Sequence, residues 1–185
     1  MGKVKNKPEI EWVLPNDRGI IPVGKVHCSK SLKKIIKKNK FSISFNKNFN
    51  EVIKNCANRE KTWINSTIYD LFITLHQMGF AHSVEVSRNK DLVGGLYGLT
   101  LGSVFFAESM FSFFPNSSKL ALIAIMAKIN YGGFKVFDTQ FPSKHLNTLG
   151  GATISKEDFE QKLYYTNDNS ADFNRLPKLK NWEEF

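Results

Sequence analysis

Three extended stretches in close succession constrain the fold of this chain more than any other feature of the sequence. They run over residues 81–88, 92–100 and 103–111. Turn residues separate them, with Asn89-Lys90-Asp91 after the first stretch and Gly102 after the second. Connections this short join neighbouring strands, so the three stretches predict an antiparallel meander.

A helix that is apolar on most of its sides follows the meander. Its apolar residues run from Leu120 to Ile129, Asn116 or Ser117 can cap it, and Gly132-Gly133 ends it. The short apolar run 134–138 comes next. It predicts an interior strand that the helix joins to the meander, and which is therefore parallel to its neighbour.

Shorter periodic segments flank this unit. Alternation predicts a strand over 41–45, and helical spacing predicts helices over 49–56 and 68–78. A sequence similar to a capping box at Ser155 begins a last helix that ends near Tyr164. Together these elements predict an α+β or α/β fold with a mixed, mostly antiparallel central sheet flanked by helices.

The chain has 185 residues, 42% of them hydrophobic, which suits one globular domain with a real core. We expect a short N-terminal segment over 1–28, the domain over 29–165, and a C-terminal tail over 166–185 packed on the domain. Four apolar residues could hold that tail in place: Leu176, Leu179, Trp182 and Phe185.

Several classes of protein are disfavoured. The longest apolar run, 120–127, is too short to span a bilayer, and no apolar region follows the positive N-terminus, so we expect a cytoplasmic protein without a membrane partner. Cys28 and Cys56 form no CxxC motif and are expected to be free thiols. Nothing in the sequence requires a metal or an organic cofactor.

The positive charge is concentrated at the start of the chain. Residues 1–40 hold eleven Lys or Arg against three acidic residues, a local charge of +8 out of a total of +9. Such a block favours a polyanionic partner, nucleic acid above all. The alternative is a solvated surface in a lysine-rich chain.

One segment of this block, 29–39, has the pattern of an amphipathic helix. Leu32, Ile35 and Ile36 share one face. A stripe of four lysines lies opposite them: Lys30, Lys34, Lys37 and Lys38. A stripe of point charges suits successive phosphates of an RNA and would position the RNA without reading its bases.

Longer motifs resemble the leucyl/phenylalanyl-tRNA–protein transferase family over about Trp12 to Leu163. The matching strings are, in order, RGIIP, HCSKSLKK, FNEVIKNCA, KTWI, AHSVEV, LVGGLYGLTLG, FFAESMFS, NSSKLAL, GGFKVFDTQ and HLNTLGG. The resemblance implies a GNAT-like acyltransferase fold that uses aminoacyl-tRNA in place of acyl-CoA. It implies transfer of Leu, Phe or Met to proteins that begin with Arg or Lys, which marks them for degradation as an N-degron.

The resemblance also assigns residues to the reaction. Glu108 matches an acidic residue at the acceptor-binding and reaction centre, and Asp138 and Gln140 match a pair assigned to catalysis. Asp138 and Gln140 are two residues apart on a predicted strand, so their side chains would point towards one site at the carboxyl end of that strand. Apart from the resemblance, the residues also fit a simpler interpretation without a functional role. In it, Asp138 and Gln140 lie at a solvated strand end and Glu108 faces outward from an alternating strand.

The family's other subsites also have counterparts here. Trp63 matches a tryptophan near the bound aminoacyl-adenosine, and Leu96, Ile125 and Ile129 fall where an apolar pocket holds the transferred side chain. The four lysines of the stripe fall on the family's tRNA-binding cluster. The implied partners are aminoacyl-tRNA and acceptor proteins, and we expect a monomer.

The sequence departs from the family in several places. Two N-terminal motifs, Gly-Gly-Asp-Leu and Gly-Ile-Phe-Pro-Trp, are expected to be missing because the chain begins later. Ser87, Ala107, Phe72 and Phe113 replace Trp, Gly, Tyr and Arg. These changes leave open an acceptor that begins with Asp or Glu.

Two other functions compete with aminoacyl transfer. An acyl-CoA enzyme of the same fold would need a glycine-rich pyrophosphate loop, and 110–119 lacks one. The other is a noncatalytic basic tRNA-binding module, for which the lysine stripe would be sufficient. Against it, the chain has no RNP-type strand or Gly-x-x-Gly loop, which common RNA-binding modules contain.

Overall fold

A computed structural model describes residues 13–38, 40–166 and 170–175. The strands are β1 (Asp17–Pro22), β2 (Ser42–Phe45), β3 (Ala81–Arg88), β4 (Asp91–Leu101), β5 (Val104–Ser112), β6 (Val136–Gln140) and β7 (Ala152–Ser155). The helices are α1 (Lys30–Lys37), α2 (Phe49–Ala57), α3 (Ser66–Gln77), α4 (Ser117–Tyr131), α5 (Lys144–Asn147) and α6 (Lys156–Thr166).

The seven strands form one sheet in the order β2-β3-β4-β5-β6-β1-β7. Neighbours pair antiparallel except β5 and β6, which are parallel and joined through α4. The predicted meander and its crossover are therefore confirmed. The fold is a mixed α/β arrangement of the acyltransferase-like kind, with a mostly antiparallel sheet.

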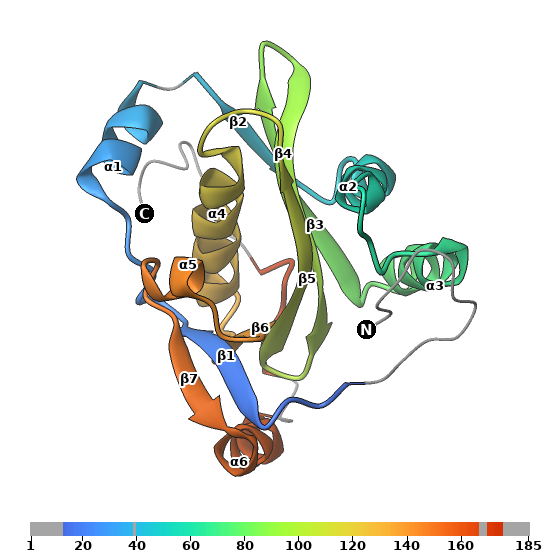
Figure 1. Cartoon of the computed structure of the whole chain (residues 1–185), viewed down its shortest axis with the longest axis vertical. Coiled ribbons are helices and arrows are strands. Elements are labelled where there is room, and N and C mark those ends of the chain that lie inside the picture. Colours follow the sequence, from blue (N-terminus) through green and yellow to red (C-terminus); the bar gives the residue numbers. More distant parts are fainter. Residues whose placement is uncertain (1–12, 39, 167–169, 176–185) are drawn as a thin grey trace.

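Helices cover both faces of this sheet. The long helix α4 packs on β3, β4 and β5 from one side, and α2 and α3 pack from the other (Figure 1). Two hydrophobic clusters result, one under α4 and one under the α2–α3 pair. The helix α6 packs on β7 and β1 at the far end of the sheet.

The apolar composition of α4 agrees with its burial on nearly all sides. Its N-cap is Asn116, which has a left-handed φ of 69° and makes no capping hydrogen bond with its side chain. The hydroxyl of Ser117 instead donates to the carbonyl oxygens of Val93 and Phe114, which ties the start of the helix to β4.

Sequence periodicity does not reveal β1, β7 or α5. The strand β1 comes from the expected N-terminal segment, yet it lies inside the sheet between β6 and β7. It is six residues long and contains Gly19 and Pro22. The four-residue strand β7 has no buried residue. Their strand conformation depends on pairing with distant segments, which local patterns do not record.

The last predicted helix is present as α6, and the main-chain N–H of Asp158 donates to Ser155 Oγ at 3.0 Å. Of the tail expected over 166–185, the structure describes Thr166, which ends α6, and residues 170–175. Phe173 is buried and stacks on His82 at a centroid distance of 3.8 Å. The four apolar residues from Leu176 to Phe185 lie outside the described residues.

Within the described ranges, no helix is long and apolar enough to cross a membrane. The same ranges contain no cluster of three or more potential metal-ligating side chains. Cys28 and Cys56 are both free thiols, as expected.

Candidate active site

The site lies where β5 and β6 part. Their parallel pairing covers three residue pairs, from Val104 with Val136 to Phe106 with Asp138. Beyond that point Glu108 from β5 and Gln140 from β6 meet through their side chains, with Gln140 Nε2 donating to Glu108 Oε2 at 3.1 Å. A gap between parallel strands at their carboxyl ends is where α/β sheets place ligands.

Asp138 is held by an arginine that the sequence does not reveal as a site residue. Arg18 Nε donates to Asp138 Oδ1 at 2.8 Å, and Arg18 Nη2 donates to Asp138 Oδ2 at 2.7 Å. Both side chains are buried, and the guanidinium lies 4.5 Å from the ring centroid of Phe159. The two residues are 120 positions apart, so no motif or spacing could have paired them.

Gln140 leaves the regular strand conformation. Its φ of 66° lies in the left-handed region, and its main-chain N–H donates to Asp138 Oδ1 at 3.1 Å. Asp138 therefore faces Arg18 while the Gln140 side chain faces Glu108, although the spacing predicts one shared direction. The buried Gln140 Oε1 has no hydrogen-bond partner among the described residues.

Glu108 titrates near neutral pH. Burial raises the pKa of Glu108 to about 7, the nearby Asp138 carboxylate adds to the shift, and the Gln140 hydrogen bond opposes it. An incoming cation would favour the ionised form. Glu108 therefore combines the charge needed to bind a cation with a pKa suited to proton movement.

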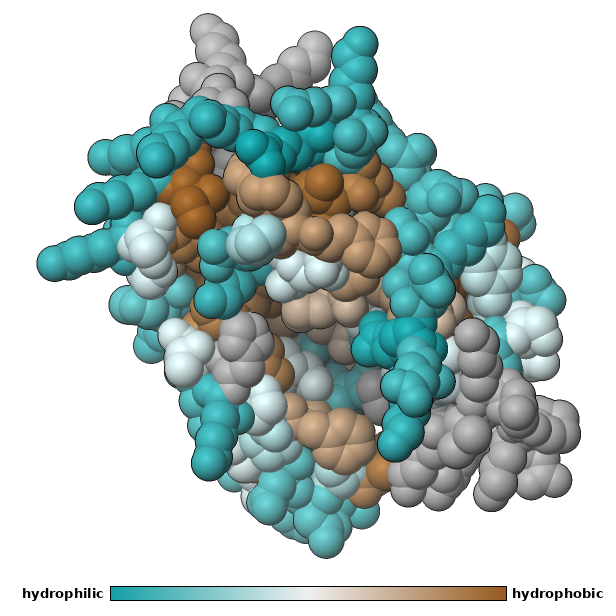
Figure 2. All heavy atoms as spheres, turned by 45° about the horizontal axis from the view of Figure 1, so that its top comes forward, coloured by the Kyte–Doolittle hydropathy of each residue, from teal (hydrophilic) through white to brown (hydrophobic). Residues whose placement is uncertain are grey.

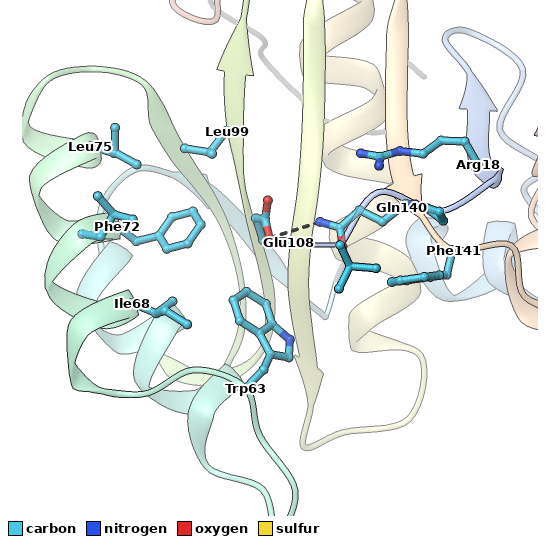
Figure 3. Close-up of a pocket in the computed structure, with 12 residues that line it drawn as sticks. Arg18, Trp63, Ile68, Phe72, Leu75, Leu99, Glu108, Gln140 and Phe141 are labelled. Atoms are coloured by element: carbon cyan, nitrogen blue, oxygen red, sulfur yellow. Dashed lines mark hydrogen bonds between the residues drawn. The ribbon is translucent and has the colours of Figure 1, made fainter. Parts of the chain in front are cut away.

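A cavity of about 420 Å³ opens on the α3 side of Glu108 (Figure 3). Apolar side chains of α3, together with Trp63, Leu99 and Phe141, form most of its wall. Its polar groups come from Arg18, Glu108 and Gln140. The cavity thus brings a mainly apolar volume against the three linked polar residues.

A second cavity, of about 230 Å³, also has Glu108 and Trp63 in its wall. The rest of its lining is mainly apolar: Leu96, Ala107, Met110, Leu122, Phe137 and Leu146. Arg59, Ser109 and Thr139 complete it, and the buried Thr139 Oγ1 has no hydrogen-bond partner among the described residues. Two mainly apolar cavities of different size therefore share Glu108 and Trp63.

The expected apolar pocket corresponds to this smaller cavity in part. Leu96 and Trp63 line it, whereas Ile125 and Ile129 are fully buried in the core and line neither cavity. Both isoleucines follow Leu122 along one face of α4. Neither Leu122 nor Phe137 could be singled out from the sequence, because the continuous apolar runs 120–127 and 136–137 give no sign of which residue faces a cavity.

The lysine stripe is exposed on α1 and at its C-terminal end. Leu32 is buried beneath it, and Ile35 and Ile36 are half-buried. Figure 2 shows hydrophilic side chains projecting at the left edge of the molecule, where α1 lies in Figure 1. None of the four lysines lines either cavity. The stripe is thus a surface feature outside the wall of the site.

Comparison with known proteins shows the family to which this chain is similar. The family described as leucyl/phenylalanyl-tRNA protein transferase matches residues 20–164. A protein named leucyl/phenylalanyl-tRNA–protein transferase from Maricaulis maris is 42% identical over 96% of this chain and 84% of its own. One of the same name from Cereibacter sphaeroides is 43% identical over 94% of this chain and 81% of its own.

Among solved structures, a crystal structure of FemX matches with a TM-score of 0.57 at 12% identity, over 87% of this chain and 66% of that one. At this identity the match concerns the fold alone. The family match extends over most of the described residues and includes Glu108, Asp138 and Gln140. The chain belongs to the leucyl/phenylalanyl-tRNA–protein transferase family.

Proposed function

We propose that this chain transfers Leu, Phe or Met from charged tRNA to the N-terminal amine of proteins that begin with Arg or Lys. Family membership makes it an aminoacyltransferase. The observation that carries the choice of acceptor is the pairing of Glu108 with Gln140. The Glu108 carboxylate and the buried Gln140 amide oxygen, which has no partner among the described residues, offer hydrogen-bond acceptors that suit an ammonium or a guanidinium group.

The smaller cavity suits the transferred side chain. Leu96, Leu122 and Phe137 give it an apolar wall. The side chain of a bound Leu, Phe or Met would move from water to this wall, and the burial of its apolar surface would favour binding. Thr139 lines the same cavity, and its buried Oγ1 has no hydrogen-bond partner in the part of the chain that the structure describes; we assign it to the backbone of the aminoacyl group.

The reacting ester would then lie beside Glu108, where the two cavities share their wall. The amine nitrogen attacks the ester carbonyl carbon, and the C–N bond forms as the C–O bond to the tRNA ribose breaks. The proton lost from the amine ends on the ribose oxygen. Because the ester is already activated, positioning can supply most of the acceleration.

Gln140 is the residue best placed to orient the amine. Its Nε2 is engaged by Glu108, so its Oε1 is left to accept a hydrogen bond from an amine N–H. Glu108 binds the cationic side chain of the acceptor. Asp138 lies behind both residues and supports Gln140 through the main chain.

The tRNA would be held at two places. Trp63 lines both cavities and is available to stack on the terminal adenosine. The lysine stripe of α1 would contact phosphates farther along the acceptor stem. Because the proposed reaction consumes charged tRNA, we propose that the protein acts in the cytoplasm.

An acceptor beginning with Asp or Glu would require a cation with donors to spare. Two nitrogens of each arginine that lines the cavities already have partners, since Arg18 binds Asp138 in two places and Arg59 donates to Cys56, Ser109 and Met110. An acidic side chain at this site would also be repelled by the Glu108 carboxylate, which lines both cavities. The charge arrangement thus favours basic acceptors.

A transfer assay tests the proposal. The purified chain is mixed with leucyl-tRNA and with peptides that differ only in an N-terminal Arg, Lys, Asp or Glu. We expect leucine on the Arg and Lys peptides. Transfer to the Asp or Glu peptides alone would overturn the acceptor assignment, and transfer to none of them would overturn the proposed reaction.

A further inference from the structure

Arg18 stands at the start of an unbroken series of contacts that ends at the reacting groups. Its guanidinium holds both oxygens of Asp138 at 2.7 and 2.8 Å. Asp138 Oδ1 also accepts the Gln140 main-chain N–H at 3.1 Å, and Gln140 Nε2 reaches Glu108 at the same distance. The series connects three strands, β1, β6 and β5.

Asp138 has little capacity left for proton transfer. Its carboxylate accepts two charge-assisted hydrogen bonds from Arg18 and one from the Gln140 main chain, and it is fully buried. A carboxylate used in this way is an anchor, because taking up a proton would weaken the contact with a guanidinium that cannot release one.

The conformation of Gln140 explains what the anchor does. A non-glycine residue at a φ of 66° is held in a sparsely populated region and keeps that conformation only where its surroundings impose it. The hydrogen bond from the Gln140 N–H to Asp138 is one such constraint. It turns the Gln140 side chain out of the strand pattern and towards Glu108 (Figure 3).

The close approach of β1 brings Arg18 to this anchor. Gly19 lies so near β6 that a Cβ there would be 2.7 Å from Thr139 Oγ1 and 2.8 Å from the Phe141 carbonyl group. The register of the β1–β6 pair also shifts between Gly19 and Ile20. Arg18 is then packed between Asp138 and the Phe159 ring, which limits its rotamers.

We propose that Arg18 is a positioning residue for aminoacyl transfer, which acts through Asp138 on the main chain of Gln140 and so sets the Gln140–Glu108 pair. This inference rests on the proposed function. It makes Asp138 a positioning residue as well, with Gln140 and Glu108 left as the groups that touch the substrates.

A single-turnover experiment tests it, with enzyme in excess over leucyl-tRNA and well above its dissociation constant for that tRNA, and with the Arg-initiated peptide at saturation. The first-order rate constant then reports competent enzyme and is independent of the folded fraction. In Arg18→Ala we expect it to fall by up to about 100-fold, since a small displacement of positioned groups has that effect. The affinity for charged tRNA stays at the wild-type value.

Guanidinium ions at millimolar concentration supply a second readout. Arg18 lines the larger cavity, so the space vacated in Arg18→Ala is open to a small planar cation that can form the same paired hydrogen bonds. We expect guanidinium to restore part of the rate constant. Arg18→Lys keeps the positive charge but loses the paired hydrogen bonds of the guanidinium, so its rate constant should also be lower than that of wild type. This variant replaces Arg18→Ala in the experiment if Arg18→Ala does not fold.

Arg88→Ala is the matched control, because Arg88 also lies over an aromatic ring, at 4.2 Å from the centroid of Phe114, without lining either cavity. It should keep the wild-type rate constant and be unaffected by guanidinium. Wild-type rate constants in both Arg18 variants, or a fall that guanidinium leaves unchanged, would overturn the inference. Absence of transfer by the wild-type protein would instead contradict the proposed function.

Discussion

Gln140 connects the two carboxylates of the site. Its main-chain N–H donates to Asp138, and its side-chain amide donates to Glu108. Gln140→Ala keeps the first contact and removes the second together with the free Oε1. We expect turnover to fall by about 100-fold, because the amine is no longer oriented. Steady-state kinetics and a tRNA binding titration, which should give an unchanged dissociation constant, check this.

The control for this change is Gln161→Ala on the exposed face of α6, which should behave as wild type. Asp138→Ala should also lower turnover without weakening tRNA binding. Equal turnover in Gln140→Ala, Asp138→Ala and wild type would show that this linked group is not part of the reaction.

Glu108 should also make the free energy of unfolding depend on pH. Burial raises the pKa of Glu108 from 4.5 to about 7, so between these values the folded chain holds a proton that the unfolded chain releases. The free energy of unfolding then falls as the pH rises through this window, by up to about 3 kcal/mol in total. Urea unfolding of wild type and Glu108→Gln at several pH values measures it.

In that comparison Glu108→Gln should lack this part of the pH dependence, since the amide does not titrate. A variant that loses stability with rising pH as steeply as wild type would assign the effect to another group.

At the scale of the element, the helix α1 has one face buried against the domain and an opposite face on which the lysine stripe is exposed. Lys34→Ala combined with Lys37→Ala should weaken binding of charged tRNA. It should also flatten the plot of log affinity against log salt by roughly 0.7–0.9 for each phosphate that is no longer neutralised. Binding titrations across a salt series provide the slope.

The matched control removes the same charge elsewhere, with Lys54→Ala and Lys162→Ala, both exposed on other helices. It should keep the wild-type slope. If the α1 variant and the control have the same slope, the stripe is a solvated surface.

Elements with a strong local pattern could be predicted from the sequence, and those that depend on distant pairing could not. The meander and α4 carry their patterns within themselves. The strand β1 becomes a strand because it lies between β6 and β7, so Arg18 could not be recognised as a neighbour of Asp138. The positions of Glu108 and Gln140 came from motifs, while their contact became visible only in the fold.

At the scale of the whole molecule, the parting of β5 from β6 creates one site with two unequal cavities. The smaller one has an apolar wall and should select the transferred residue by shape. We expect Leu, Phe and Met to be favoured over Ile and Val by roughly 10- to 200-fold, because bulk at Cβ is hardest to admit at a narrow opening. Competition between charged tRNAs for one Arg-initiated peptide gives the order.

Charged side chains should be excluded far more strongly from the apolar part of that cavity, since an ion among Leu96, Leu122 and Phe137 would have neither water nor a partner. Efficient transfer of Arg in place of Leu would show that the donor side chain does not bind among Leu96, Leu122 and Phe137.

The central claim is that Glu108, shared by both cavities, recognises the cationic end of the acceptor. Its most direct test is the ratio of kcat/KM for a peptide that begins with Arg to that for the same peptide beginning with the neutral isostere citrulline. In Glu108→Gln this ratio should fall by about 10- to 100-fold relative to wild type, the value of a charge-assisted hydrogen bond. The preference for Leu over Val as donor should stay unchanged. An undiminished preference for Arg in Glu108→Gln would contradict the account.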